Sequence, residues 1–344
     1  MRRRGRASAA ARSLGAPVLA VLVAGAACGL LLAALGVPLL GALRALVEGA
    51  AGDRLALENT LVRSGPLLLI GLGVALSFRC GIWNIGGEGQ LYAGALAATA
   101  VATRVVDPSA GGWVLAVSLA AGGLAGALWG GIAAALRVGR NVSEVLGTLL
   151  LNFVAALGVA YAVHGPLQEL AGAYPQSDLL VEGARLPVLP GLYRVHAALP
   201  VAYLVPLAAW LFLFRTSAGL RIRAVGLGPD AARYAGISPA RETIRVLLLS
   251  GGLAGLAGAV EVCGVTGRLF ENLSPGYGFS AIAVALLARL HPLGIVPSAL
   301  LFAGLATGSG GMQRVAHVPS VTVEVVEALV ILLSVGFALP RRSP

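Results

Sequence analysis

Long apolar runs separated by short polar breaks fill almost the whole chain. From Ser13 to Leu43 the only ionisable side chain is that of Cys28, and this run exceeds the ~20 residues that a helix needs to cross a bilayer. The pattern predicts an all-α, polytopic membrane bundle of about ten helices, over residues 16–43, 60–78, 90–106, 113–136, 144–164, 198–214, 245–263, 278–290, 293–311 and 321–339. We expect the eighth to be a half-helix or tilted, because it is short for a full crossing.

The first run has a second interpretation, as a cleaved signal peptide. Arginines precede it, and Ala26-Ala27-Cys28 resembles a lipoprotein cleavage site. The run is longer than the apolar region of a signal peptide. We therefore expect an uncleaved span.

Many runs are rich in glycine and alanine, as in Gly122–Gly126 and Gly251–Gly258. Small residues at four-residue spacing let helix backbones approach closely, which predicts a tightly packed bundle. In a chain with 48 glycines, such spacings also arise by chance.

The composition excludes a soluble globule and an ATPase. The 344 residues are 58% hydrophobic and only 12% charged, about half the charged share of an average globular domain. Lysine is absent, so the chain lacks the Gly-Lys-Ser/Thr of a P-loop. The net charge of +10 comes from arginines scattered between apolar runs, which argues against nucleic acid as a partner. We expect the chain itself to bind no metal and no cofactor.

The distribution of arginine predicts the orientation. With the amino terminus in the cytoplasm, 17 of the 25 arginines fall inside and 8 outside, which satisfies the positive-inside rule and puts both termini in the cytoplasm. Two connections are long, an outer loop of residues 165–197 and an inner loop of residues 215–244. Neither holds a catalytic domain, so we predict one transmembrane domain over residues 1–344 and no enzyme activity.

A polar break between the second and third runs is the first candidate site. The segment Arg79–Gln90 contains four glycines together with Asn84, Glu88 and Gln90. The backbone of such a break must line a cavity, be covered by protein or lie at the membrane surface. It indicates either a discontinuous helix beside a solute path or an ordinary cytoplasmic turn, in which Glu88 favours the positive end of the next helix. Both interpretations stay open.

A second break, Glu271–Phe279, precedes the eighth run as the first break precedes the third. It holds an asparagine, then glycines, with Tyr277 and Phe279 at the start of a small-residue helix. The predicted topology puts one break on the cytoplasmic side and the other outside, as an inverted repeat of spans 2–5 and 7–10 requires. The matching residues are few, so chance is the competing explanation.

Few polar side chains lie inside the predicted spans. Asn152, near the middle of the fifth, can either hydrogen-bond between helices or contact a solute. A charged carboxylate in mid-membrane costs about 2.5–3.5 kcal/mol on insertion scales, so Glu261, in the seventh, is expected to face protein or water. For Glu324 and Glu327, in the tenth, an interfacial position is favoured over a site.

The inner loop contains a predicted short, basic helix. Pro229 suits the first turn of a helix, and Gly236 suits its end. Such a helix would offer Ala231, Ala232 and Tyr234 for docking to another protein. A solvated loop without a partner is the alternative.

Four stretches carry a resemblance to a known family: Phe78–Gln90, Asn141–Asn152, Gly219–Ile237, and Gly276–Phe279 with its continuation through Gly294. In them the chain resembles the permease subunits of bacterial ATP-binding-cassette (ABC) importers for nucleosides and simple sugars. The Asn-Ile-Gly-x-Glu-Gly-Gln pattern that begins at Asn84 is specific to this group, and ribose and branched-chain amino-acid permeases share a looser version. Trp83 and Gly87 depart from the residues common in relatives, which leaves the solute open.

The resemblance implies two permeases in the bacterial plasma membrane, two ATPase subunits that use the ATP, and an external solute-binding lipoprotein of the basic-membrane-protein type. The second permease is expected to be a different chain. Residues 215–244 would be the coupling loop, with ATPase docking at Pro229, Asp230, Ala231, Ala232, Arg233, Tyr234 and Gly236. The solute path would include Asn84, Glu88, Gln90, Asn152, Tyr277 and Phe279. An ion-coupled secondary transporter of a small polar solute is the competing function, because inverted repeats and intramembrane carboxylates suit it equally well.

Overall fold

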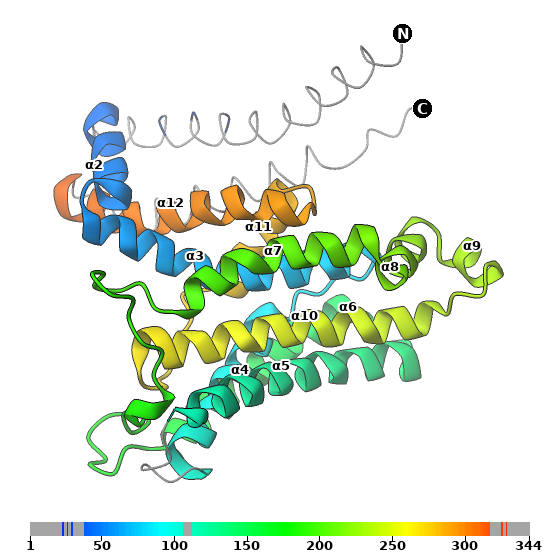
Figure 1. The fold of residues 1–344 in the computed structure, drawn as a ribbon, viewed down its shortest axis with the longest axis horizontal. Helices are drawn as coiled ribbons and strands as arrows, with labels where there is room; N and C mark the ends of the chain where they lie inside the picture. Colours follow the sequence, from blue (N-terminus) through cyan, green and yellow to red (C-terminus); the bar gives the residue numbers. More distant parts are fainter. Residues whose placement is uncertain are drawn as a thin grey trace.

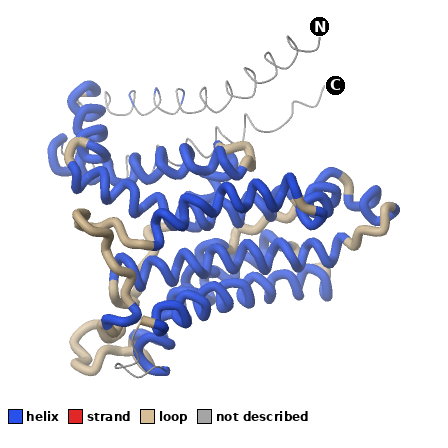
Figure 2. The backbone as a smooth tube through the Cα atoms, viewed as in Figure 1, coloured by secondary structure: helices blue, strands red, loops and turns tan. Residues whose placement is uncertain are grey.

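The computed structural model describes residues 38–105 and 112–316, together with residues 23, 26, 29, 325 and 328. Over these ranges the regular structure is helical, and β pairing is limited to two isolated bridges (Figure 2). Most of the first predicted span, nearly all of the tenth, both chain termini, and the residues Cys28, Glu324 and Glu327 lie outside the described part.

The described helices follow the apolar runs closely. They are α2 (Leu39–Ala51), α3 (Arg54–Arg79), α4 (Gly87–Ala100) continued by the π-turn η1 (Val101–Val105), α5 (Trp113–Arg140), α6 (Glu144–Val163), α7 (Ala198–Arg215), α8 (Ser217–Leu227), α9 (Pro229–Tyr234), α10 (Pro239–Glu261) continued by the π-turn η3 (Val262–Thr266), α11 (Tyr277–Leu287) and α12 (Ile295–Ala316), with short 3-10 turns η2 (Glu182–Ala184) and η4 (Pro292–Gly294). The second to ninth predicted spans each coincide with one of them.

Six of these helical segments are long and apolar enough to cross a membrane. They are Arg54–Arg79, Trp113–Arg140, Glu144–Val163, Ala198–Arg215, Pro239–Thr266 and Pro292–Val315. The chain is therefore a multi-pass membrane protein. The helix α11 has only 11 residues, which confirms that the eighth predicted span is too short for a full crossing.

The connection between the first two predicted spans, residues 44–59, is mostly helical. Pro38 precedes α2, whose helix runs on to Ala51, and α3 begins at Arg54. On the exposed side of this helix Arg44 and Glu48 pair at 2.7 Å, next to exposed apolar side chains such as Leu40 and Val47. Hydropathy missed it because charged residues four apart stabilise a helix without making it apolar.

Two helices form the centre of the bundle, and the others surround them (Figure 1). In the most apolar stretch of α3 83% of the residues are buried, and in that of α10 72% are. In α5, α6 and α7 the corresponding share is only 22–33%. The helix α3 packs on α11 and α12, and α10 packs on α4 and α5, while α3 and α10 also contact each other. The outer helices expose large apolar side chains such as Leu124, Leu157 and Leu204, as contact with lipid requires.

Glycines allow α5 and α10 to approach closely. A Cβ at Gly251 would fall on the carbonyl of Gly126, and a Cβ at Gly255 would fall on that of Gly122. These are the small-residue segments that the sequence singled out, so the prediction of close helix packing is confirmed there.

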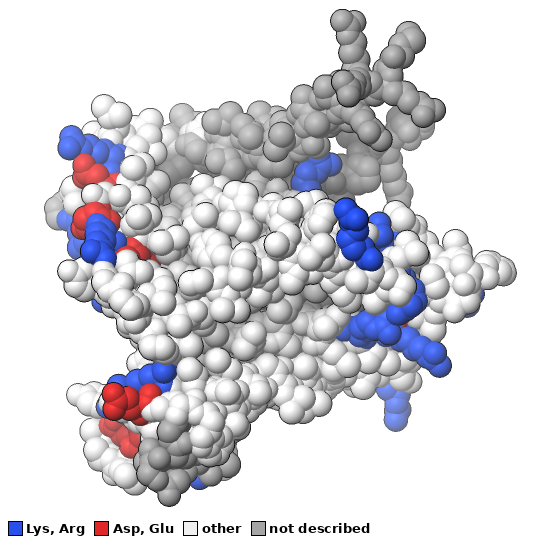
Figure 3. All heavy atoms as spheres, in the orientation of Figure 1, with Lys and Arg blue, Asp and Glu red and all other residues white. Residues whose placement is uncertain are grey.

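The charged side chains gather at the two ends of the bundle (Figure 3). Arginines cluster at the end that carries α8 and α9, whereas acidic and basic side chains mix at the opposite end. An uncharged band separates the two, as expected for the part that lies in the membrane. We call the two ends the arginine-rich end and the mixed-charge end.

Candidate functional site

The first polar break folds back into the bundle. Asn84 is only 1% exposed, and its amide nitrogen donates to Oγ of Ser250, in the middle of α10, at 2.8 Å and to Oε1 of Gln90 at 3.1 Å. Its Oδ1 accepts from the backbone N–H of Gly86 at 2.9 Å. Asn84 thus fixes the turn that starts α4, and protein covers this turn.

A side chain of α6 closes the same break from the other side. Oδ1 of Asn152 accepts from the N–H of Gly89 at 2.8 Å, and its Nδ2 donates to the carbonyl of Ile85 at 2.9 Å. Oγ1 of Thr148 accepts from the N–H of Ile85 at 3.2 Å. The first N–H groups of a helix have no partner within the helix, and these side chains supply partners. Asn152 therefore hydrogen-bonds to the backbone of another segment, which is one of the two roles that the sequence left open.

The second break meets the first at the amino end of α4. Oε2 of Glu88 accepts from the backbone N–H of Gly278, in the first turn of α11, at 2.7 Å. A Cβ at Gly278 would fall on the backbone of Glu88. The amino ends of the two short helices therefore touch, and both point their positive dipole ends toward the Glu88 carboxylate.

The predicted path residues divide into two groups. Asn84, Glu88, Gln90 and Asn152 are buried and hydrogen-bonded within the protein. Tyr277, at the start of α11, lines a cavity, and Phe279 is 43% exposed.

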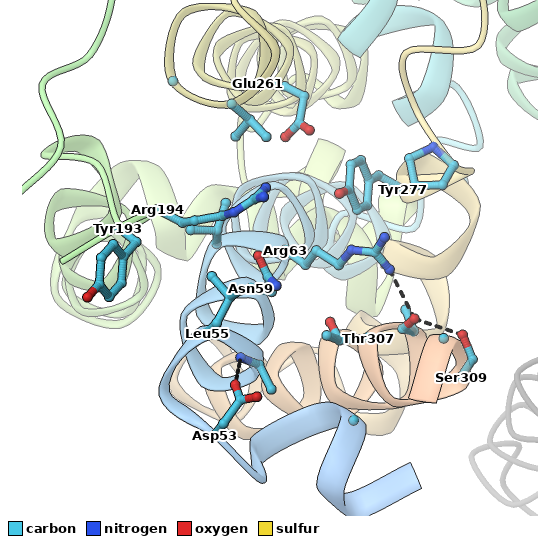
Figure 4. A pocket seen from close by; sticks show the side chains of 18 of the residues that line it. Asp53, Leu55, Asn59, Arg63, Tyr193, Arg194, Glu261, Tyr277, Thr307 and Ser309 are labelled. Carbon is cyan, nitrogen blue, oxygen red and sulfur yellow. Dashed lines mark hydrogen bonds between the residues drawn. The ribbon is translucent and has the colours of Figure 1, made fainter. Parts of the chain in front are cut away.

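That cavity has a volume of about 1080 Å³ and lies at the mixed-charge end. Figure 4 shows side chains from several elements pointing into it. Asn59 and Arg63 come from α3, Glu261 from the end of α10, and Tyr277 and Thr307 from α11 and α12. The loop before α7 adds Tyr193 and Arg194.

The cavity has the oppositely charged residues Arg63 and Glu261 in its walls. Arg63 is oriented by a 3.0 Å hydrogen bond from one terminal nitrogen to the carbonyl of Ala306. Glu261 is 6% exposed, and in the described part of the chain no ion pair ties it to Arg63. The Asn59 amide and the hydroxyls of Tyr277 and Thr307 add hydrogen-bond donors and acceptors to the walls. Such walls suit a solute rich in hydroxyl groups, since polar groups that lose water need new partners.

Sequence reasoning missed most of this cavity. It placed Arg63 among the outside arginines, and it did not consider Asn59, although the two are four residues apart and share a helix face. It did expect Glu261 to face protein or water, as it does. The lining comes from distant segments of the chain, so no local spacing could reveal it.

The inner loop forms two short helices, α8 and α9. Pro229 occupies the first turn of α9, and Gly236, with φ of 78°, follows its end, as predicted. Arg233 pairs with Asp230 at 3.1 Å. Tyr234 is 95% exposed, whereas Ala232 is buried against the bundle. The face open to a partner is therefore formed by Ala231 and Tyr234 rather than by all three candidates.

The fold and the cavity define a helical membrane permease. The family described as branched-chain amino acid transport system / permease component matches residues 56–335, and the chain belongs to this family. It is therefore a permease component of an ABC transporter and not the ATPase.

Several characterised permeases are similar to the chain over most of its length. A glucose ABC transporter permease of Haloferax volcanii is 38% identical, covering 96% of this chain and 91% of the relative. The guanosine permease NupP of Bacillus subtilis is 34% identical, covering 92% and 91%. A nucleoside permease of Lactococcus lactis subsp. cremoris, NupB, is 31% identical, covering 87% and 84%. No solved structure matches the chain significantly.

Proposed function

We propose that the chain is one permease half of an ABC importer that carries nucleosides or simple sugars. The observation that carries the proposal is the cavity of about 1080 Å³ at the mixed-charge end, lined by Asn59, Arg63, Glu261 and Tyr277. It exceeds the ~300–1,000 Å³ of ordinary ligand pockets, so a nucleoside or hexose fits with room for water. The named solutes of the similar permeases, glucose and guanosine, have this chemistry.

The proposed topology has about ten spans with both termini in the cytoplasm of a bacterial plasma membrane. The arginine-rich end would be the cytoplasmic one, so the cavity opens outward. An inverted repeat of spans 2–5 and 7–10 is supported by the packing, because α3 contacts α11 and α12 as α10 contacts α4 and α5. The touching amino ends of α4 and α11 agree with two equivalent half-helices.

The proposed partners are an ATPase pair, an external solute-binding lipoprotein and a second, different permease. Two guanosine permeases of Bacillus subtilis are similar to this chain, at 34% and 30% identity. So are two nucleoside permeases of Lactococcus lactis, at 31% and 30%. Such pairs favour a core of two unlike permeases. ATP would be used by the ATPase, and this chain would bind no cofactor.

We assign the coupling role to residues 215–244 and the solute path to the cavity and the break that supports it. Tyr277 would contact solute directly. Asn84, Glu88, Gln90 and Asn152 would act by holding the ends of the half-helices, and exposed Phe279 would face the partner permease or lipid. ATP binding would close the ATPase pair, move α8 and α9 with it and switch the path between inward and outward access.

Uptake by the complete transporter tests the proposal. The chain, its genomic neighbours for ATPase, second permease and receptor, and labelled guanosine or glucose are combined in proteoliposomes. Glu261→Gln should lower uptake by roughly tenfold, as loss of a charged contact of about 1.4 kcal/mol would. Glu144→Gln, which removes a carboxylate at the arginine-rich end, should leave it unchanged.

Two results would contradict the proposal. Equal uptake by the two variants would show that the cavity is not part of the solute path. Uptake by the chain alone under a proton or sodium gradient, with no ATPase present, would favour a secondary transporter.

A further inference from the structure

Two arginines at the arginine-rich end lie on one aromatic ring. The guanidinium carbon of Arg79, the last residue of α3, is 5.2 Å from the centre of the Phe214 ring. That of Arg223, in α8, is 5.1 Å from the same centre. His291 stacks on this ring at 5.8 Å. The ends of α3, α7 and α8 and the turn before α12 thus converge on Phe214.

The backbone holds the two arginines in place. A Cβ at Gly226 would fall on the carbonyl of Arg79, so α8 lies directly against the end of α3. Nε of Arg79 donates to the carbonyl of Leu290 at 2.7 Å, which orients its guanidinium. The pair is therefore part of the fold rather than two side chains free in solvent.

Within the described residues, neither arginine is neutralised by an acidic side chain. Over the described ranges no carboxylate lies within 4.0 Å of Arg79 or Arg223. At the same end, Arg221 and Arg245 both contact Glu242. Nε of Arg223 is buried and has no hydrogen-bond partner. A buried donor without a partner is unfavourable, and two like charges beside one ring repel each other.

An anion within reach of both guanidinium groups would offset the repulsion between their charges. Arginine forks match the oxygens of a phosphate and can bind them in pairs. The neighbouring Trp210, 6.3 Å from Phe214 and covered by Arg215 at 5.6 Å, is typical of the level at which lipid headgroups meet a helix. Basic pockets between helices at this level bind acidic headgroups.

We propose that Arg79 and Arg223 bind the phosphate of an anionic phospholipid headgroup in the leaflet at the arginine-rich end. The headgroup ties α8, which precedes the proposed coupling helix α9, to the end of α3. The site is separate from the solute cavity, which lies at the opposite end of the bundle.

Native mass spectrometry of the purified full chain in detergent tests this site. Phosphatidylglycerol is titrated against the wild type and against Arg79→Gln and Arg223→Gln. Each variant should bind roughly fivefold more weakly, since one arginine near a headgroup contributes about 1 kcal/mol. Arg140→Gln removes the same charge at the same end and should bind as the wild type does. Phosphatidylcholine, with a phosphate but no net charge, should bind more weakly than phosphatidylglycerol.

Two further arms make the outcome decisive. Inorganic phosphate is added without lipid, and if it raises the thermal unfolding midpoint of the wild type but not of Arg223→Gln, the site is upheld with free phosphate as its source. Arg223→Lys keeps the positive charge but loses the planar guanidinium. It serves as a control for misfolding and should lose less affinity for phosphatidylglycerol than Arg223→Gln. Equal binding of phosphatidylglycerol by Arg223→Gln and Arg140→Gln, with no effect of phosphate on either, would overturn the proposal.

Discussion

The backbone amide of Gly278 donates to Oε2 of Glu88 at 2.7 Å, although the two residues are 190 positions apart in the chain. This contact joins the amino ends of α4 and α11 inside the bundle. Both helices are short, with 14 and 11 residues, and α4 continues only through the π-turn η1. The junction therefore substitutes for the continuous backbone that a full span would have, and it supports the wall that carries Tyr277.

Replacing Glu88 should destabilise this junction. Glu88→Leu leaves the buried N–H of Gly278 without an acceptor and should cost about 1–3 kcal/mol of unfolding free energy. Glu88→Gln keeps an acceptor oxygen and should cost less. The thermal unfolding midpoint in detergent measures both, and a Leu variant as stable as the Gln variant would show that the contact contributes little.

The α5–α10 interface should have no room for an added side chain. Gly255→Ala places a Cβ on the carbonyl of Gly122 and should destabilise the bundle by about 1–3 kcal/mol through overpacking. Gly158→Ala, on α6, meets no atom within 4 Å and should be neutral or slightly stabilising. Unfolding midpoints of the two variants are compared, and equal midpoints would mean that the helices can separate at no cost.

The double variant Arg233→Glu with Gly236→Pro should uncouple ATP hydrolysis from uptake. Gly236 has φ of 78°, which proline cannot adopt, and Arg233→Glu breaks the pair with Asp230. The complex should still insert, because α9 is the outermost element at its end (Figure 1). ATPase activity and uptake are measured together, with Arg140→Glu as the charge control. Normal uptake in the double variant would refute the coupling role.

The outer loop should lose stability in acid through Glu169. The Gln176 amide, at 2.7 Å, is the largest influence lowering the pKa of Glu169 below its ordinary 4.5, and the N–H of Tyr174 and the guanidinium of Arg268 act the same way. A carboxyl with a lowered pKa stabilises the fold above its ordinary pKa, and this is lost as pH falls through the lowered value.

The unfolding midpoint of the wild type should therefore fall more steeply below pH 4.5 than that of Glu169→Gln. Glu182→Gln, an exposed position in the same loop, should follow the wild type. Parallel curves for the wild type and Glu169→Gln would show that the loop does not depend on this carboxylate.

The success of the sequence reasoning depended on how local each feature is. The apolar runs predicted α3 and α10 well, because a helix that is apolar all round needs no neighbour to be recognised. Pro229 and Gly236 predicted the bounds of α9, because the preferences of proline and glycine for helix ends are also local. The start of α3 was missed because Asp53, which caps it at 2.7 Å through Ala56 N–H, lies among charged residues.

The sequence by itself determined the membrane character, the positions of the long apolar helices, the charge asymmetry of the two ends and the family, since each depends on composition or on residues near in the chain. Only the tertiary structure decided that Asn84 and Asn152 satisfy the backbone of the break, that Glu88 meets Gly278, and that Arg63 and Glu261 face one cavity. Those relationships join residues from different helices, and their geometry follows from how glycine faces let the helices pack, which hydropathy does not encode.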